Sequence, residues 1–115
     1  MHRDPRAYLW DIMQAAEAIQ RWIAGLDLQA YAESEVVQSA VERKFEIIGE
    51  ALNQLSKLYP TLANQIHDAR NIIAFRNLLI HGYAMIEHDR VWGIARDSLP
   101  RLKIVVVSLL SKLGS

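Results

Sequence analysis

The residues best suited to chemistry lie in one short segment, residues 76–83, which reads Arg-Asn-Leu-Leu-Ile-His-Gly-Tyr. Histidine titrates near neutral pH and passes protons in either direction, so His81 is a candidate general acid or base. The guanidinium of Arg76 can bind a phosphate oxygen and stabilise charge that develops on phosphorus. The amide of Asn77 can orient either neighbour. Such a set suits metal-independent cleavage of RNA, in which a base activates a 2′-hydroxyl for attack on the adjacent phosphate.

Spacing alone also allows a purely structural interpretation of this segment. A single histidine on a helix is more often a surface or hydrogen-bonded core residue than a catalyst, and Tyr83 could simply pack after the helix end. The mixed carboxylate and histidine cluster at residues 87–89 is too weak to predict metal ligands. The residue pattern therefore leaves catalysis and structure open as alternatives.

Helix geometry predicts where the side chains of this segment point. At about 100° per residue, Arg70, Asn77 and His81 share a polar strip, which makes Arg70 a possible RNA contact. Arg76 falls instead between Ile72 and Ile80, where an unpaired guanidinium would be costly. We therefore expect Arg76 either to reach solvent or to find an acidic partner.

A line of acidic residues on the preceding predicted helix could supply that partner. Glu42, Glu46 and Glu50 recur at four-residue spacing opposite the apolar stripe of their helix. Patterning favours a solvated face for this line. The alternative is that Glu46 or Glu50 supports Arg76.

Apolar residues recur at three- and four-residue steps along most of the chain, which predicts amphipathic helices. The long predicted helices span residues 5–24, 34–59, 68–82 and 89–115, and their connectors hold at most a short helical turn. Pro100 predicts a kink or a new start within the last of them, because its ring nitrogen cannot donate a hydrogen bond. Four or five helices with short connectors predict an all-α, up-and-down bundle that forms a single domain over residues 1–115. Trp10 and Trp22, which flank the first apolar stripe, are interpreted as core or dimer-interface aromatics, and Trp92 is expected to pack in the last helical region.

Length and charge limit the possible classes of function. The 115 residues allow one domain, and 13 Lys and Arg balance 13 Asp and Glu, which excludes binding of nucleic acid through bulk positive charge. Residues 26–59 hold six acids and three bases, whereas residues 60–115 hold four acids and seven bases. The chain has no cysteine, which excludes disulfides and cysteine-based zinc sites. No apolar run approaches the roughly 20 residues that a membrane span needs, so we expect a cytoplasmic protein without a membrane partner.

Residues 76–83 resemble the Arg-X4-His-X-Tyr signature of the HepT-like branch of the HEPN-domain toxins, a former domain of unknown function. Further matches occur in the expected order at Arg3-Asp4, Tyr8-Leu9, Asp11-Ile12, Glu42-Arg43, residues 45–51, Val91-Trp92 and Leu99-Pro100. The resemblance therefore covers nearly the whole chain.

The resemblance implies a fold, an activity and a partner. Members of the family are all-α bundles that dimerise and place two copies of the motif in one cleft. They resemble metal-independent endoribonucleases that act on mRNA or tRNA and leave a 2′,3′-cyclic phosphate. Carried over to this sequence, His81 is the general acid or base, Arg76 stabilises the phosphate and Asn77 orients them.

The implied partner is the antitoxin of a type II toxin–antitoxin system, an MNT-type nucleotidyltransferase. It uses ATP to transfer AMP onto the motif tyrosine, here Tyr83, so the toxin chain itself needs no cofactor. A competing interpretation is a non-catalytic helical adaptor that binds such a nucleotidyltransferase. Incubation of the free protein with RNA separates the two, since only the first predicts cyclic-phosphate ends.

Overall fold

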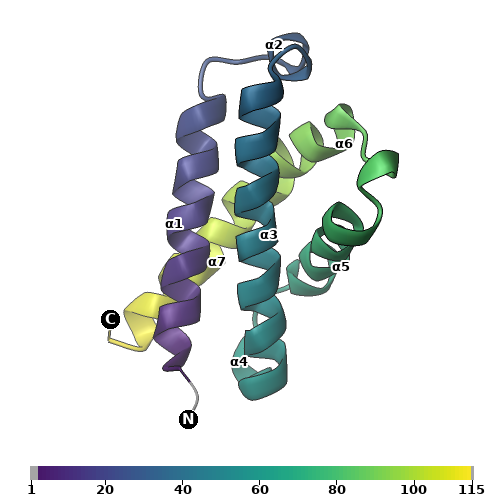
Figure 1. Ribbon diagram of the computed structural model, residues 1–115. Coiled ribbons are helices and arrows are strands. Elements are labelled where there is room, and N and C mark those ends of the chain that lie inside the picture. The colour runs from purple at the N-terminus through teal and green to yellow at the C-terminus, as the bar shows by residue number, and fades with distance from the viewer. Residues whose placement is uncertain (1–2, 115) are drawn as a thin grey trace.

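Helix boundaries follow the start and stop signals of the sequence. The structure is a computed structural model that describes residues 3–114, with the exception of the Tyr83 side chain. Its helices are α1 (Pro5–Ile23), α2 (Leu28–Ala32), α3 (Glu35–Leu58), α4 (Pro60–Ala63), α5 (Ala69–His81), α6 (His88–Gly93) and α7 (Leu99–Lys112) (Figure 1). The described residues contain no strand, so the predicted all-α fold is confirmed. Within them, no helix combines the length and apolar character needed to cross a bilayer.

Short polar side chains and a glycine set the ends of the long helices. The Asp4 carboxylate accepts a hydrogen bond from the Arg6 backbone N–H at 2.9 Å and begins α1. The Arg6 side chain hydrogen-bonds the same carboxylate and lowers the pKa of Asp4 to about 2. The Ser34 hydroxyl accepts from the Val37 N–H at 3.3 Å and begins α3. Gly25, with a φ of +81°, lies just beyond α1 in the left-handed conformation that commonly ends helices.

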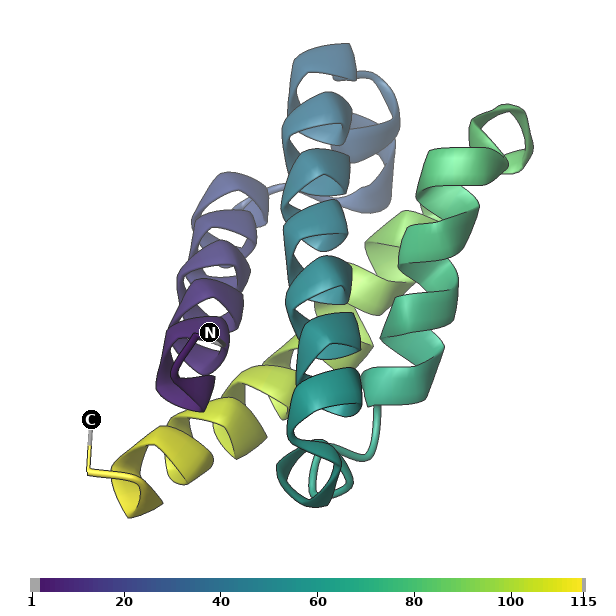
Figure 2. The ribbon, with the colours of Figure 1, turned by 60° about the horizontal axis from the view of Figure 1, so that its bottom comes forward.

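The central helix of the bundle is α3, which packs against α1 on one side and α5 on the other (Figures 1 and 2). The last helix, α7, packs against α1 and runs obliquely to it. Phe45 on α3 meets Phe75 on α5 edge to face, with ring centroids 5.3 Å apart, and both rings are buried. Because Phe75 directly precedes Arg76, this contact fixes which side of α5 faces α3 and so orients the motif residues.

The last helical region changes its winding just before Pro100. The Leu99 N–H donates to the Ile94 carbonyl, five residues earlier, so Ile94–Ser98 forms a π-helical turn. Pro100 then falls in the first turn of α7, where a missing N–H breaks no hydrogen bond of that helix. A new α-helix thus begins at Leu99, as Pro100 predicted, although it follows a wider helical turn and no side chain caps its start.

Trp10 and Trp22 do not enter the core of the described chain. Their side chains are 47% and 38% exposed, so their interpretation as core aromatics is wrong, while a dimer-interface role stays a prediction. Both flank the stripe of α1 whose centre is occupied by fully buried residues such as Ile12 and Ile19. Periodicity locates the centre of a buried stripe but not its width. Trp92 packs as expected, with its ring centroid 5.3 Å from that of Tyr31.

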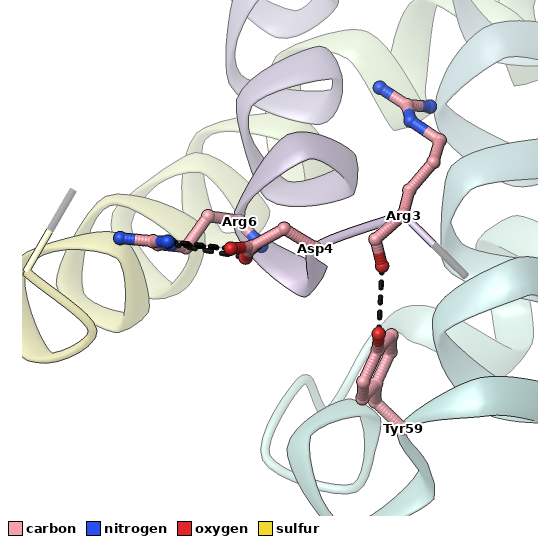
Figure 3. Close-up of polar contacts among 4 residues, drawn as sticks. All are labelled: Arg3, Asp4, Arg6 and Tyr59. Atoms are coloured by element: carbon pink, nitrogen blue, oxygen red, sulfur yellow. Dashed lines mark hydrogen bonds and ion pairs between the residues drawn. The ribbon is translucent and has the colours of Figure 1, made fainter. Parts of the chain in front are cut away.

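The residues before α1 are tied to the far end of α3 (Figure 3). The hydroxyl of Tyr59, which follows the last residue of α3, donates to the Arg3 carbonyl at 2.7 Å. The Arg3 guanidinium pairs with Asp11 at 3.0 Å and lies 4.7 Å from the centroid of the Tyr8 ring. Both the backbone and the side chain of Arg3 are therefore fixed, and the side chain extends away from Tyr59 (Figure 3).

Glu42, on α3, is expected to weaken the fold at neutral pH. Burial raises the pKa of Glu42, the charge of His88 opposes this shift, and Glu46 adds to it. A carboxyl with a raised pKa in the folded state stabilises the fold most at low pH, and this contribution is lost as the pH rises through that pKa. We therefore expect Glu42→Gln to raise the free energy of unfolding at pH 7 by about 0.5 kcal/mol, a small gain because the side chain stays partly hydrated.

Thermal melts followed by circular dichroism test this expectation. The exposed Glu35, replaced by glutamine in the same helix, is the control and should give no gain, because its charge lies in the first turn of α3 and favours the helix. The gain from Glu42→Gln should disappear near pH 3, where the wild-type carboxyl is also neutral. A gain of equal size at both pH values would show that the charge is not its cause.

Candidate active site

The motif helix α5 comes very close to α3 at one point. A Cβ atom built on Gly49 of α3 would lie 2.2 Å from the Cβ and 2.5 Å from the Cγ of Arg76. Only a residue without a side chain permits this approach. The root of the Arg76 side chain therefore rests on the backbone of α3, one residue away from Glu50.

The guanidinium of Arg76 is held from two sides. Its Nη2 donates to Glu50 Oε2 at 2.7 Å, and its Nη1 donates to Asn77 Oδ1 at 2.9 Å. Gln54 Nε2 donates to the other Glu50 oxygen at 3.0 Å, so the carboxylate is itself fixed. Two of the five N–H donors of Arg76 are used in this way, and its side chain is 21% exposed. The Nε atom is buried without a hydrogen-bond partner, so the donors left for a ligand are the second N–H groups of Nη1 and Nη2. They belong to a group whose position is already set, which is what phosphate binding in a transition state requires.

His81 is the last residue of α5, and its side chain is exposed. Asn77 and Arg70 are exposed as well, so the polar strip expected from helix geometry faces outward in this chain. Arg76 and His81 project about 140° apart around α5. The Asn77 side chain contacts the Arg76 guanidinium. His81 projects to a different side of α5 from Arg76, and so the two do not meet within one chain.

Arg70 and Tyr83 lie at opposite ends of α5. Arg70 is on the first turn, where it lines a separate cavity of about 590 Å³ together with His67. The backbone of Tyr83 opens a 3-10 turn, Tyr83–Met85, two residues after His81. The structure therefore does not bring Arg70 to the Arg76 network within one chain.

One member of the acidic line on α3 (Glu42, Glu46 and Glu50) pairs with the motif helix instead of facing only solvent. Of the two glutamates considered as supports, Glu50 holds Arg76, whereas Glu46 lies 3.7 Å from Arg43. The choice between them follows from the helix crossing, because Glu50 is adjacent to Gly49 and Glu46 is almost one turn away. Sequence spacing could not settle this, since both glutamates lie on the same face of α3.

A cavity of about 450 Å³ between α1, α3 and α5 adjoins this network, and we call it the α1–α3–α5 groove. Its lining includes three guanidinium groups and their acidic partners, namely Arg3 with Asp11, Arg43 with Glu46 and Arg76 with Glu50. Sequence reasoning did not identify Arg3 or Arg43 as site residues, because the groove joins residues far apart in the chain. The only signal was that both lie in segments that match the family.

The fold and the site together define a class of protein. A small helical bundle presents an arginine, an asparagine and a histidine on one helix, with the arginine fixed by a neighbouring helix. In the described part of the chain, no three His, Asp or Glu side chains gather as a metal site would require. One side of its motif helix can bind a phosphate through the arginine, and another side carries the histidine that can transfer a proton.

Comparison with known proteins identifies the family. A family model described as ribonuclease HepT-like matches residues 12–109, and the chain belongs to this family. A protein of Thermococcus cleftensis named "Probable ribonuclease HepT" is 31% identical over 90% of this chain and 93% of its own length. One of Methanocaldococcus jannaschii named "Putative RNase" is 29% identical over 88% of this chain and 92% of its own length. No solved structure matches the chain significantly. The family that residues 76–83 indicated is thereby confirmed.

Proposed function

We propose that the chain is the toxin of a type II toxin–antitoxin pair, a metal-independent endoribonuclease that cleaves mRNA or tRNA in the cytoplasm. The observation that carries the proposal is the guanidinium of Arg76, held by Glu50 and Asn77 five residues before His81, in a chain of the HepT-like family. The names of its relatives, which describe ribonucleases, support the same class of activity.

In the proposed reaction, His81 takes the proton of a ribose 2′-hydroxyl, whose oxygen then attacks the adjacent phosphorus. Arg76 stabilises the negative charge on the non-bridging oxygens, and Asn77 holds the guanidinium in place. The bond from phosphorus to the 5′-oxygen breaks, and that oxygen takes up a proton. The products are a 2′,3′-cyclic phosphate and a 5′-hydroxyl, and no step needs a cofactor.

The active unit in this proposal is a homodimer. Because Arg76 and His81 project about 140° apart, one copy of α5 does not focus both side chains on a single phosphate. Two copies of α5 that face each other across a two-fold axis bring the arginine of one copy beside the histidine of the other. The exposed polar strip of α5 supports this arrangement, since it leaves Asn77 and His81 accessible.

We further propose that an MNT-type nucleotidyltransferase neutralises the toxin by transferring AMP from ATP to the Tyr83 hydroxyl. A bond forms between the tyrosine oxygen and the α-phosphorus, and pyrophosphate leaves. An anionic adenylate two residues from His81 repels RNA phosphate and fills the space that the substrate needs. The backbone of Tyr83 opens a 3-10 turn two residues beyond the end of α5, close in sequence to His81.

End-group analysis of RNA tests the proposed function. Purified protein incubated with total RNA in the presence of EDTA is expected to produce 2′,3′-cyclic phosphate and 5′-hydroxyl ends. A His81→Ala preparation, purified identically, controls for contaminating nucleases. Co-expression with the nucleotidyltransferase should add AMP to Tyr83, as measured by mass spectrometry, and abolish the cleavage. If the protein binds the nucleotidyltransferase but yields no cyclic ends, the adaptor is the correct interpretation.

A further inference from the structure

The α1–α3–α5 groove extends beyond Arg76 into a part of the molecule that phosphate chemistry does not require. Its volume of about 450 Å³ is in the range of cavities that hold small ligands. Arg76 and Ile80 of the motif helix line one side, whereas Arg3 and Tyr8 come from the N-terminal region. A ligand group that enters the groove is therefore adjacent to the phosphate that Arg76 would bind.

Arg3 has the properties of a stacking surface inside this groove. Its carbonyl accepts from the Tyr59 hydroxyl (Figure 3). Its guanidinium pairs with Asp11 and lies over the Tyr8 ring. The Arg3 side chain nevertheless remains 52% exposed. Guanidinium planes stack on unpaired bases in single-stranded RNA recognition. A planar group that is held in place, lines the groove and remains half-exposed is suited to that task.

Glu46 offers hydrogen-bond acceptors to the same groove. Its side chain is 32% exposed, and within the described residues its ion-pair partner is Arg43 at 3.7 Å, which is longer than a hydrogen bond. Glu50, in contrast, accepts hydrogen bonds from both Arg76 and Gln54. Asp11 pairs with Arg3 at 3.0 Å. Among the three carboxylates that line the groove, Glu46 is therefore the one whose ion-pair contact lies beyond hydrogen-bond distance, and both of its oxygens can accept donors from a ligand. Arg43, whose side chain is 68% exposed, places guanidinium donors beside it.

We propose that the α1–α3–α5 groove is a nucleobase subsite that selects guanine next to the cleaved phosphate. The base stacks on Arg3, its N1–H and N2–H₂ groups donate to the Glu46 carboxylate, and its O6 accepts from Arg43. Guanine alone presents two adjacent donors beside an acceptor on its Watson–Crick edge. Adenine and cytosine present one donor group next to an acceptor, and uracil presents one N–H between two carbonyls. This inference rests on the proposed function and adds a base preference to it.

Binding of mononucleotides tests the subsite without any cleavage step. Titrations of the wild-type protein with 5′-GMP, 5′-AMP and 5′-UMP, followed by NMR, are expected to give a dissociation constant about tenfold lower for 5′-GMP than for the other two. Glu46→Gln should remove most of this difference, because an amide offers one acceptor where the carboxylate offers two. Glu35→Gln, an exposed change on the same helix, should retain the full preference. Equal binding of the three nucleotides, or an unchanged preference in Glu46→Gln, would overturn the assignment.

Mapping of cut sites separates this inference from the proposed function. Sequencing of cyclic-phosphate ends is expected to show guanine enriched beside the cut in wild-type digests and a weaker bias in Glu46→Gln digests. Cleavage that depends on His81 but shows no guanine bias would contradict the subsite and support the ribonuclease function. Selective binding of 5′-GMP without any cleavage would support the subsite and contradict the ribonuclease function. Groove resonances that respond to protein concentration and not to 5′-GMP would show that a second copy covers the groove, which also overturns the inference.

Discussion

Replacement of Arg76 by alanine is expected to lower the rate of RNA cleavage by about 100-fold or more, the usual cost of removing a donor that stabilises transition-state charge. Among the motif side chains that the structure describes, Arg76 is fixed by another helix, through Glu50, and keeps one unused N–H on each of its Nη atoms. Its loss should appear in kcat at saturating RNA more than in KM, because the charge it stabilises develops only in the transition state. Single-turnover cleavage of a short RNA measures this difference.

A lysine at the same position is the matched variant. Arg76→Lys keeps the charge but replaces a planar fork by one ammonium group, which cannot contact Glu50, Asn77 and a phosphate together. We expect it to recover only a small part of the lost rate. The fold should survive both changes, since the Glu50 side chain is 46% exposed and water replaces its lost partner at a cost of about 1 kcal/mol or less.

Two variants together, Arg76→Ala and His81→Ala, test the catalytic roles of the motif residues. If Arg76→Ala and His81→Ala both cleave RNA and arrest growth as the wild type does, the motif is not the active site. If only Arg76→Ala is inactive and its circular dichroism spectrum has changed, the loss reflects the α3–α5 contact instead. Unchanged spectra with lost activity in both variants would support the proposed roles.

The sequence predicts the helices of this protein well because their signals are local. Asp4, Ser34 and Gly25 act within one helical turn, and the structure places helix ends beside all three. The π-helical turn before Pro100 was not predictable, since it depends on how α6 and α7 are both held against the rest of the bundle. Trp10 was misjudged because helical periodicity does not show how far a neighbouring helix covers the flanks of a stripe.

The contacts within the candidate site could not be predicted from the sequence. Helix geometry placed Arg76 among aliphatic side chains, which predicted that it either reaches solvent or pairs with an acid, and Glu46 and Glu50 were equivalent on the helix wheel. The register of α3 against α5 decides between them, and Gly49 sets that register. An isolated glycine in the middle of a long helix is the sequence signal that could have located the crossing.

Gly49→Ala should destabilise the protein, although the same change usually stabilises a helix. The new Cβ would lie 2.2 Å from the Cβ of Arg76, which is rigidly attached to the α5 backbone, so the two helices must separate. Overpacking of this kind costs about 1–3 kcal/mol, whereas alanine returns about 0.5–1 kcal/mol of helix propensity. We expect a net loss of about 1–2 kcal/mol, a fall in melting temperature of roughly 5 °C.

Gly93 provides the matched control for this prediction. It ends α6 with helical backbone angles, and a Cβ built there meets nothing within 4 Å. Gly93→Ala should therefore raise stability by about 0.5–1 kcal/mol, with a sign opposite to that of Gly49→Ala. Cleavage should also fall in Gly49→Ala alone, because separation of α3 from α5 pulls Glu50 away from the guanidinium that it holds. Equal stability gains in the two variants would mean that α5 does not rest on Gly49, and the geometry of the candidate site would then be wrong.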